Sequence, residues 1–449
     1  MLLGLAGLLV TATDVHAQSA AGAARPDDGP QWAAPGPWPV GVRSVSIDAG
    51  AVDALDALAR GDSAAAPVSR ALAARLWYPS VAGPGAGTLS RSLKDHPWRG
   101  WNTPSVTATS PSRARLDAAP APGSTRWPVV VLSHGLMNWA ELMADLGEHL
   151  ASHGHVVVAV QHEDEGHEDP LRAALAFRPL DIEAARDAVQ RIDATPGDAL
   201  SGRLDLQRMA VVGYSMGGYG ALVTAGARVQ TDSLAFRYVP GRSMAPHATG
   251  SGAPVSPAWK AVVAIAPWGG QRQFGALAGE GLRGIKIPAL LLGGDQDDIS
   301  GYTDGVRSVW TGLTATTRWL LTLENARHNI GHMGWVNGLP SQFRTWEAFE
   351  EPVWRRDRLL QVQRHFILAF LGRHLGSVEG TATALEVPTA RAADGTWPVP
   401  WGTAATGDWA RPGGPGTGYW PGFQRRWALG LRLEKLPPGP VAAPPAKSP

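Results

Sequence analysis

Residues 211–220 read Val211-Val212-Gly213-Tyr214-Ser215-Met216-Gly217-Gly218-Tyr219-Gly220, and they predict a strand, a tight turn and a helix with a serine at the apex. The apolar residues before the turn suit a buried parallel strand, and the small residues after it can continue as a helix. Glycines at 213 and 217 remove the Cβ atoms that would clash in so sharp a reversal. We interpret the stretch as a nucleophile elbow that presents the hydroxyl of Ser215 above a sheet.

The composition is that of an ordinary globular protein. The chain has 449 residues, of which 44% are hydrophobic and 18% charged, and its net charge is +1. This balance gives no electrostatic argument for a nucleic-acid partner. The chain contains no cysteine, which excludes disulfides, a cysteine nucleophile and thiolate metal sites. Nothing in the sequence indicates an oligomeric state.

The N-terminal residues predict an export signal. An apolar run from Leu2 to Ala12 is too short to span a bilayer, and Val15-His16-Ala17 follows it with a small-x-small cleavage pattern. A basic segment before the run is missing, and the alternative is a buried or disordered N-terminal segment. We expect residues 1–17 to be a signal peptide, the protein to be secreted or periplasmic, and no integral membrane segment to remain after cleavage.

Alternating apolar runs and helical patterns predict the fold class. Buried strands separated by helix-length crossovers form parallel sheets with helices on both faces. An antiparallel pair of strands is expected before them. We therefore expect an α/β protein with a mostly parallel, doubly wound sheet. Its expected strands lie at 40–47, 71–79, 128–133, 156–160, 209–212, 261–268, 289–294 and 319–323.

Pro-, Gly- and Trp-rich stretches divide the rest of the chain. Residues 80–126 should be mostly loop, and helices are expected over about 139–152, 180–193 and 359–375. A strand is also expected over 426–433. The expected divisions are a flexible lead-in (18–38), a main domain (39–376) with possible lids (229–258 and 329–352), a Trp-rich extension packed on the core (377–436) and a disordered tail (437–449).

A serine nucleophile needs a neighbouring base, and the base needs an orienting acid. An acidic turn follows the strand at 289–294. We choose Asp297 over Asp295, which is nearer the strand, and over Asp298, which could cap a helix or form a turn. His328 follows the strand at 319–323 and is the expected base, with His332 as the alternative. No metal or organic cofactor is expected.

The same chemistry needs backbone N–H donors that stabilise an oxyanion. One donor should come from the residue after the nucleophile, which is Met216, and one from a loop after an early strand. Leu136 follows His134-Gly135 at the end of such a strand and is the expected second donor, with Met137 as the alternative.

Residues 131–136, 213–218 and 294–298, together with His328, resemble the α/β-hydrolase superfamily. Within it, the chain over residues 40–376 is most similar to platelet-activating factor acetylhydrolases, dienelactone-hydrolase-like proteins and cutinase-like polyesterases. The resemblance implies a serine esterase that cleaves small-molecule or lipid-like carboxylic esters, most often with short acyl chains. A lipase-like or polyester hydrolase that acts at an interface is the first alternative. A binding protein that keeps the fold without turnover is the second.

Further residues carry expectations about the substrate. We expect Trp268, His134, Met137 and Trp335 to contact it, although Trp335 could equally pack in the core. The string 162–169 holds two histidines and five carboxylates. Carboxylate-rich loops are usually solvated, so we favour a role in shaping the pocket or orienting the oxyanion loop over a metal site.

Overall fold

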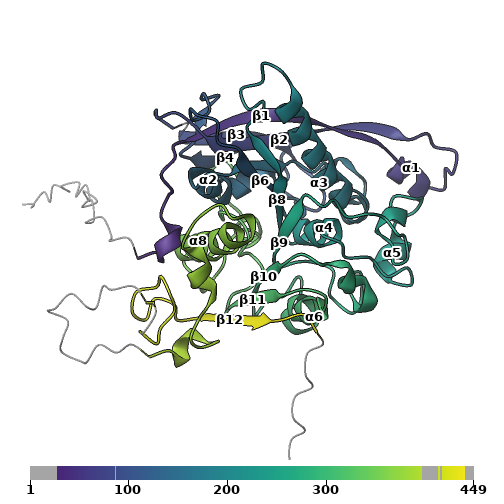
Figure 1. The fold of residues 1–449 in the computed structure, drawn as a ribbon. Helices are drawn as coiled ribbons and strands as arrows, with labels where there is room; N and C mark the ends of the chain where they lie inside the picture. Colours follow the sequence, from purple (N-terminus) through teal and green to yellow (C-terminus); the bar gives the residue numbers. More distant parts are fainter. Residues whose placement is uncertain (1–27, 86, 397–412, 415–416, 440–449) are drawn as a thin grey trace, which may run out of the picture.

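The computed structural model describes residues 28–85, 87–396, 413–414 and 417–439, so the expected signal peptide lies outside the described residues. A ten-stranded sheet runs through these residues in the order β12-β11-β10-β9-β8-β6-β7-β2-β1-β5 (Figure 1). Its strands are β1 (Val40–Val52), β2 (Val68–Pro79), β5 (Arg115–Leu116), β6 (Trp127–Ser133), β7 (Val156–Val160), β8 (Leu204–Tyr214), β9 (Trp259–Ile265), β10 (Ala289–Gly294), β11 (Arg318–Leu323) and β12 (Leu431–Leu436).

The centre of the sheet is parallel. Strands β7, β6, β8, β9, β10 and β11 pair in parallel, whereas β2 joins β7 and β12 joins β11 in antiparallel fashion. The carboxyl ends of the parallel strands therefore meet along one edge, where open α/β sheets place their ligands. The expected fold class is confirmed.

Successive residues of the central strands pack on opposite faces of the sheet. Val129 and Val131 belong to one core cluster, and Val130 and Leu132 belong to the other. Because both faces are buried, the central part of each of these strands is largely apolar. Figure 1 shows the sheet nearly edge-on between the helices that cover it. These are α3 (Pro170–Ala194), α4 (Met216–Thr224) and α6 (Ser308–Gly312) on one face, and α2 (Ala144–Ser152) and α8 (Arg356–Leu375) on the other.

Helix α3 begins earlier than the helix expected over 180–193. It starts at Pro170 and continues through Pro179. The carboxylate of Asp169 caps it by accepting from the backbone N–H groups of Leu171 and Arg172 at 3.0 and 3.1 Å. A proline at the first helical position and an aspartate before it are strong start signals. The extra turns include Arg178, which contacts the loop that follows β6.

Shorter elements lie outside the two main layers. The hairpin of β3 (Gly87–Lys94) and β4 (Ser105–Ser112) occupies a region expected to be loop. Its Ser- and Thr-rich strands bury few residues, Leu89 and Leu93 among them, so the alternation of apolar residues is weak. The remaining helices are α1 (Leu55–Ala59), α5 (Leu234–Tyr238) and α7 (Phe343–Glu347), together with the short turns η1 (Gln31–Ala33), η2 (Ala140–Met143), η3 (Asp164–Gly166), η4 (Ala245–His247), η5 (Gly279–Gly284), η6 (Tyr302–Arg307), η7 (Thr381–Leu385) and η8 (Ala392–Asp394).

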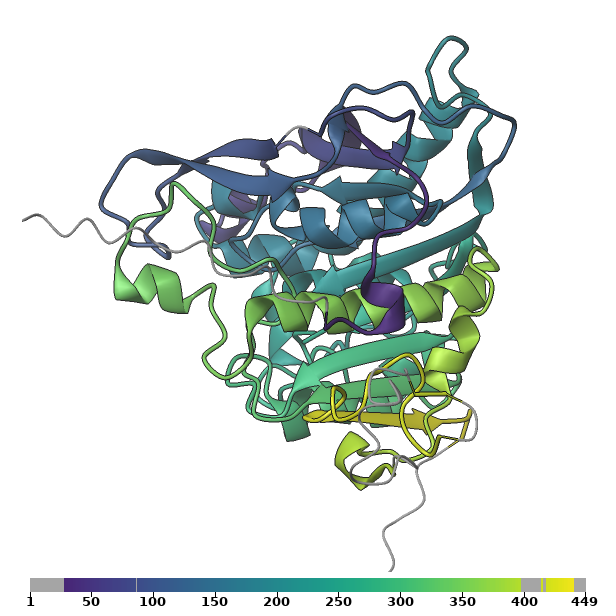
Figure 2. The same cartoon turned by 90° about the vertical axis from the view of Figure 1, so that its left-hand side faces the viewer.

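The two ends of the described chain pack on the main domain. Figure 2 shows η1 against α8, where the Trp32 N–H donates to His365 Nδ1 at 3.2 Å. At the far edge of the sheet, β12 pairs with β11 in register from Leu431 to Leu436. The strand expected from residue 426 begins later because Arg426 has a φ of 67° within a turn. No helix among the described residues combines the length and apolarity needed to cross a bilayer.

Candidate active site

Ser215 sits at the junction of β8 and α4 in a strained backbone conformation, with φ 54° and ψ −117°. Two glycines make the reversal possible. A Cβ on Gly213 would lie 2.0 Å from the carbonyl oxygen of Gly217, and a Cβ on Gly217 would lie 2.0 Å from that of Ser133. Strain of this kind persists only where the surrounding structure holds it, and it clusters at functional sites.

The structure brings Ser215, His328 and Asp297 together although they are far apart in sequence. His328 Nε2 lies 2.9 Å from Ser215 Oγ, and His328 Nδ1 lies 3.0 and 2.9 Å from the two carboxylate oxygens of Asp297. The Asp297 side chain is fully buried, and the N–H groups of Ile299 and Ser300 donate to it at 2.9 and 2.8 Å. This carboxylate is therefore held in place to orient the imidazole.

The alternatives considered from the sequence make other contacts. Asp295 accepts from the Asn325 N–H at 2.7 Å, and Asp298 forms an ion pair with Arg327. His332 Nδ1 accepts from the Gly334 N–H at 3.0 Å. Burial, with the nearby Arg356 charge, lowers the pKa of His332 well below its usual value. None of the three completes a hydrogen-bond chain to Ser215.

The two backbone N–H groups expected to stabilise an oxyanion make no hydrogen bond within the described residues. Among the described residues, the N–H groups of Leu136 and Met216 have no hydrogen-bond partner. Leu136 and Ser215 line the same cleft, whose volume is about 390 Å³. Met216 is the first residue of α4, where N–H groups lack intrahelical partners. Two free donors thus flank the serine.

A buried ion pair holds the loop after β6 from below. Arg178 is fully buried on α3 and pairs with Asp164, whose carboxylate oxygens both lie 3.1 Å from Arg178 Nε. The same guanidinium donates to the carbonyls of His134 and of Gly135, the latter at 3.1 Å. In a trans peptide the C=O and N–H groups point in opposite directions. A Gly135 carbonyl turned toward Arg178 therefore turns the Leu136 N–H away from it.

The sequence interpretation did not identify Arg178. The only available signal was a charged residue among the apolar positions of a helical pattern. Asp164 lies in the string 162–169, for which a loop-orienting role was favoured. Among the described residues no group of three or more His, Asp or Glu side chains is arranged to hold a metal ion.

A second buried chain of polar groups lies beside this pair. His162 Nε2 is 2.8 Å from Ser133 Oγ, and His162 Nδ1 is 2.8 Å from Asp181, which also pairs with Arg70 at 2.6 Å. Burial lowers the pKa of His162 and raises that of Asp181 to about 6. Ser133, His162 and Asp181 are at most 1% exposed, so they fix the end of β6 rather than meet a ligand.

The structure places three of the expected substrate contacts outside the Ser215 cleft. His134 is 2% exposed and hydrogen-bonded to its own loop, and burial lowers its pKa well below the usual value. The ring of Trp268 packs between Tyr219 and Phe274, and the backbone N–H of Trp268 donates to the Ser215 carbonyl at 3.1 Å. Trp335 packs against the cluster under the β3–β4 hairpin. None of the three lines the Ser215 cleft.

Met137 lies beside the cleft rather than in it. It has a φ of 60°, its carbonyl accepts from Arg99 at 2.9 Å, and it lines an adjoining cleft of about 290 Å³. Of the two expected lids, residues 329–352 reach the Ser215 cleft through Asn329, Arg344, Glu347 and Ala348, and residues 229–258 do not.

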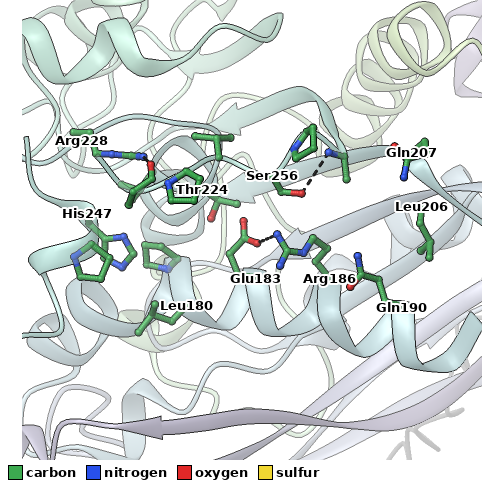
Figure 3. A pocket seen from close by; sticks show the side chains of 18 residues that line it. Leu180, Glu183, Arg186, Gln190, Leu206, Gln207, Thr224, Arg228, His247 and Ser256 are labelled. Atoms are coloured by element: carbon green, nitrogen blue, oxygen red, sulfur yellow. Dashed lines mark hydrogen bonds and ion pairs between the residues drawn. The ribbon is translucent and has the colours of Figure 1, made fainter. Parts of the chain in front are cut away.

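Part of residues 229–258 instead borders a larger cavity elsewhere. This cavity, of about 650 Å³, lies between α3, the end of α4 and residues 246–258. Figure 3 shows Glu183 and Arg186 of α3 along its floor, with His247 and Arg228 at one end. This cavity contains none of the residues expected to act with Ser215. The larger volume of a cavity therefore does not identify the candidate site in this protein.

The elbow region matches a known protein family. A model of a family described as PET hydrolase-like matches residues 118–237, which include Leu136 and Ser215. Ser215, Asp297 and His328 follow β8, β10 and β11, which is the order typical of α/β-hydrolases. The chain has the α/β-hydrolase fold.

Several curated proteins are similar to parts of this α/β-hydrolase. Cutinase est1 of Thermobifida alba is 26% identical over 200 residues, which is 44% of this chain and 52% of that protein. Bis(hydroxyethyl) terephthalate hydrolase of Streptomyces coelicolor is 24% identical over 284 residues, covering 59% and 75%. This chain thus spans about half the length of the cutinases it matches. A ferulic acid esterase structure from Streptomyces cinnamoneus superposes with a TM-score of 0.49 at 22% identity, covering 78% of this chain and 94% of that one.

The close approach at the elbow predicts a sharp stability difference between two glycine substitutions. Gly217→Ala must displace backbone because the new Cβ would meet the Ser133 carbonyl, and we expect a loss of about 2 kcal/mol or more. Gly166→Ala, where nothing lies within 4 Å, should change stability by less than about 0.5 kcal/mol. Thermal and denaturant unfolding of both variants measures the difference, and equal stabilities would contradict the geometry.

Proposed function

We propose that this α/β-hydrolase cleaves carboxylic esters through a covalent acyl-enzyme. The observation that carries the proposal is the hydrogen-bonded chain from Ser215 Oγ through His328 to the buried carboxylate of Asp297. A serine hydroxyl is a weak nucleophile until an adjacent base takes its proton. The similarity to cutinases and to a terephthalate ester hydrolase supports the same class of reaction.

The proposed reaction has two halves. Ser215 Oγ attacks the ester carbonyl carbon while His328 Nε2 takes the hydroxyl proton, and Asp297 stabilises the imidazolium. The tetrahedral intermediate collapses when His328 returns this proton to the departing alkoxide, which leaves as the alcohol. Water then attacks the acyl carbon with His328 as base, and the carboxylic acid and free Ser215 are released. No metal or cofactor takes part.

We further propose that the Leu136 and Met216 N–H groups stabilise the oxyanion, and that the Arg178–Asp164 pair is a positioning device for the first of them. Preorganised donors are effective because they need no reorientation during the reaction. The two loop carbonyls bound by Arg178 support this role, since they fix the peptide planes on either side of Gly135.

An interfacial or polymeric substrate is a second candidate. The observation that favours it is a group of exposed apolar side chains near the cleft: Ile299, Phe343 and Trp346 are 57%, 73% and 44% exposed. Exposed apolar patches mark surfaces that bind other apolar matter. Export, inferred from residues 1–17, would suit such a substrate, and N-terminal sequencing of the mature protein tests cleavage after Ala17.

The hydroxyl of Ser215 should be essential. Ser215→Ala should lower the hydrolysis of short-chain nitrophenyl esters by about 10⁴-fold or more, while the melting temperature changes little. A fluorophosphonate probe should label the wild type and not this variant. Ser63→Ala, at an exposed loop serine, is the matched control and should behave as wild type. Wild-type protein without turnover or labelling would favour a binding protein with a hydrolase fold.

The buried ion pair should act on turnover rather than on substrate binding. Arg178→Met alone leaves Asp164 as an uncompensated buried charge, which is destabilising. The double variant Arg178→Met/Asp164→Leu removes both charges and should recover stability. Its kcat should still fall by about 10- to 100-fold with KM nearly unchanged, because the oxyanion donor has lost its support. A stable double variant with wild-type kcat would refute the positioning role.

The exposed apolar side chains near the cleft, Ile299, Phe343 and Trp346, should affect the rate on aggregated substrates only. Phe343→Ser/Trp346→Ser should lower the rate on emulsified or film esters several-fold and leave monomeric ester hydrolysis nearly unchanged, because adsorption scales with exposed apolar area. Comparing the two rates in wild type and variant measures this. A proportional loss on both substrates would count against an interfacial role.

A further inference from the structure

Two clefts meet beside Ser215. The first contains the serine and has a volume of about 390 Å³, and the second has a volume of about 290 Å³. The second is bordered by Trp98, Trp101 and Phe349. The residues common to both clefts are Leu136, Asn138, Arg344 and Ala348. A substrate seated over Ser215 can therefore extend past Arg344 into the aromatic cleft.

The cationic side chains of the two clefts differ in their partners. Arg327 forms an ion pair with Asp298 and approaches Glu347 at 3.6 Å. Arg99 forms an ion pair with Glu165 and donates to the Met137 carbonyl. Both of these charges are neutralised within the protein.

Arg344 is different. It is exposed on α7, and no carboxylate or carbonyl among the described residues lies within hydrogen-bond or ion-pair distance of it. Even Glu347, one turn further along the helix, turns toward Arg327 instead. The guanidinium thus keeps its five N–H donors free at the junction of the two clefts.

We propose that Arg344 binds a carboxylate carried by the ester substrate, so that the enzyme prefers esters with a free acid group a few bonds from the scissile carbonyl. This inference rests on the proposed function and names its substrate class. A guanidinium matches a carboxylate through two parallel hydrogen bonds, and one cation balances one negative charge. The tryptophan side chains of the second cleft would cover the apolar part of such a substrate.

The ion pair between Arg344 and the substrate carboxylate should act mainly on KM. An ion pair that is made in both the ground state and the transition state lowers KM without raising kcat. Because Arg344 is partly solvated, the effect on kcat/KM should be about five-fold, the range of exposed ion pairs. Neutral esters of the same length should gain nothing from it.

The test compares matched pairs of anionic and neutral esters. On the acyl side, mono(para-nitrophenyl) adipate is paired with para-nitrophenyl hexanoate, and on the alcohol side para-acetoxybenzoate is paired with phenyl acetate. Arg344→Gln should lower the anionic-to-neutral ratio of kcat/KM about five-fold in at least one pair. Arg344→Lys should keep the charge and lose only part of the ratio. Glu347→Gln should raise the ratio, because it removes a negative charge that lines the Ser215 cleft and repels an anionic ester.

The control is Arg272→Gln, since Arg272 is an exposed arginine outside both clefts, with a side chain that is 85% accessible. Its ratio should equal that of the wild type. An unchanged ratio in Arg344→Gln for both pairs, with neutral esters still hydrolysed, overturns the substrate assignment and leaves the esterase intact. If the wild type hydrolyses none of the four esters, the proposed function itself fails, and the assignment with it.

Discussion

The backbone of Gly217 lies directly against the carbonyls of Ser133 and His134, and the geometry of the whole site depends on this contact. It joins the elbow after β8 to the end of β6, its parallel neighbour. Any side chain at 217 would separate the serine from the loop that offers the Leu136 N–H. The separation between the Ser215 hydroxyl and the Leu136 N–H group is therefore set by main-chain packing, which is stiffer than packing between side chains.

Two ion pairs near this contact differ in burial. Arg178 and Asp164 are almost fully buried beneath the loop, where a satisfied pair is costly to disturb and so fixes the carbonyls it binds. Arg327 and Asp298 pair at the rim, where solvent weakens their attraction. The buried pair thus specifies a conformation, whereas the pair at the rim contributes little to it.

The sequence predicted the parts of the site that depend on order along the chain. Ser215, Asp297 and His328 each follow a buried apolar strand, and parallel strands end at one edge, so their meeting could be expected. Arg178 could not be expected in the same way, because its contacts depend on how one helix packs across the sheet. His134 and Trp268 were expected to contact the substrate, but neither lines the Ser215 cleft. A loop has an inner and an outer side, and residue type does not decide which side faces the cleft.

Secondary structure was predictable where burial was continuous and less so elsewhere. The central strands are apolar on both faces, whereas β3 and β4 carry serine and threonine and bury only one side. Helix α3 was expected only over 180–193, where its apolar residues have helical spacing, yet it begins at Pro170 after the Asp169 cap and continues through Pro179.

Strand β12 has a consequence for the integrity of the sheet. It covers β11, which would otherwise present an unpaired row of backbone groups, the kind of edge that recruits strands from other molecules. The Glu324 N–H just beyond β11 also donates to the Gly430 carbonyl at 2.8 Å, four residues before His328. Residues 430–436, more than a hundred residues after His328 in sequence, thus have two effects. They cover the edge of the sheet against pairing with other molecules, and they hold the start of the loop that carries His328.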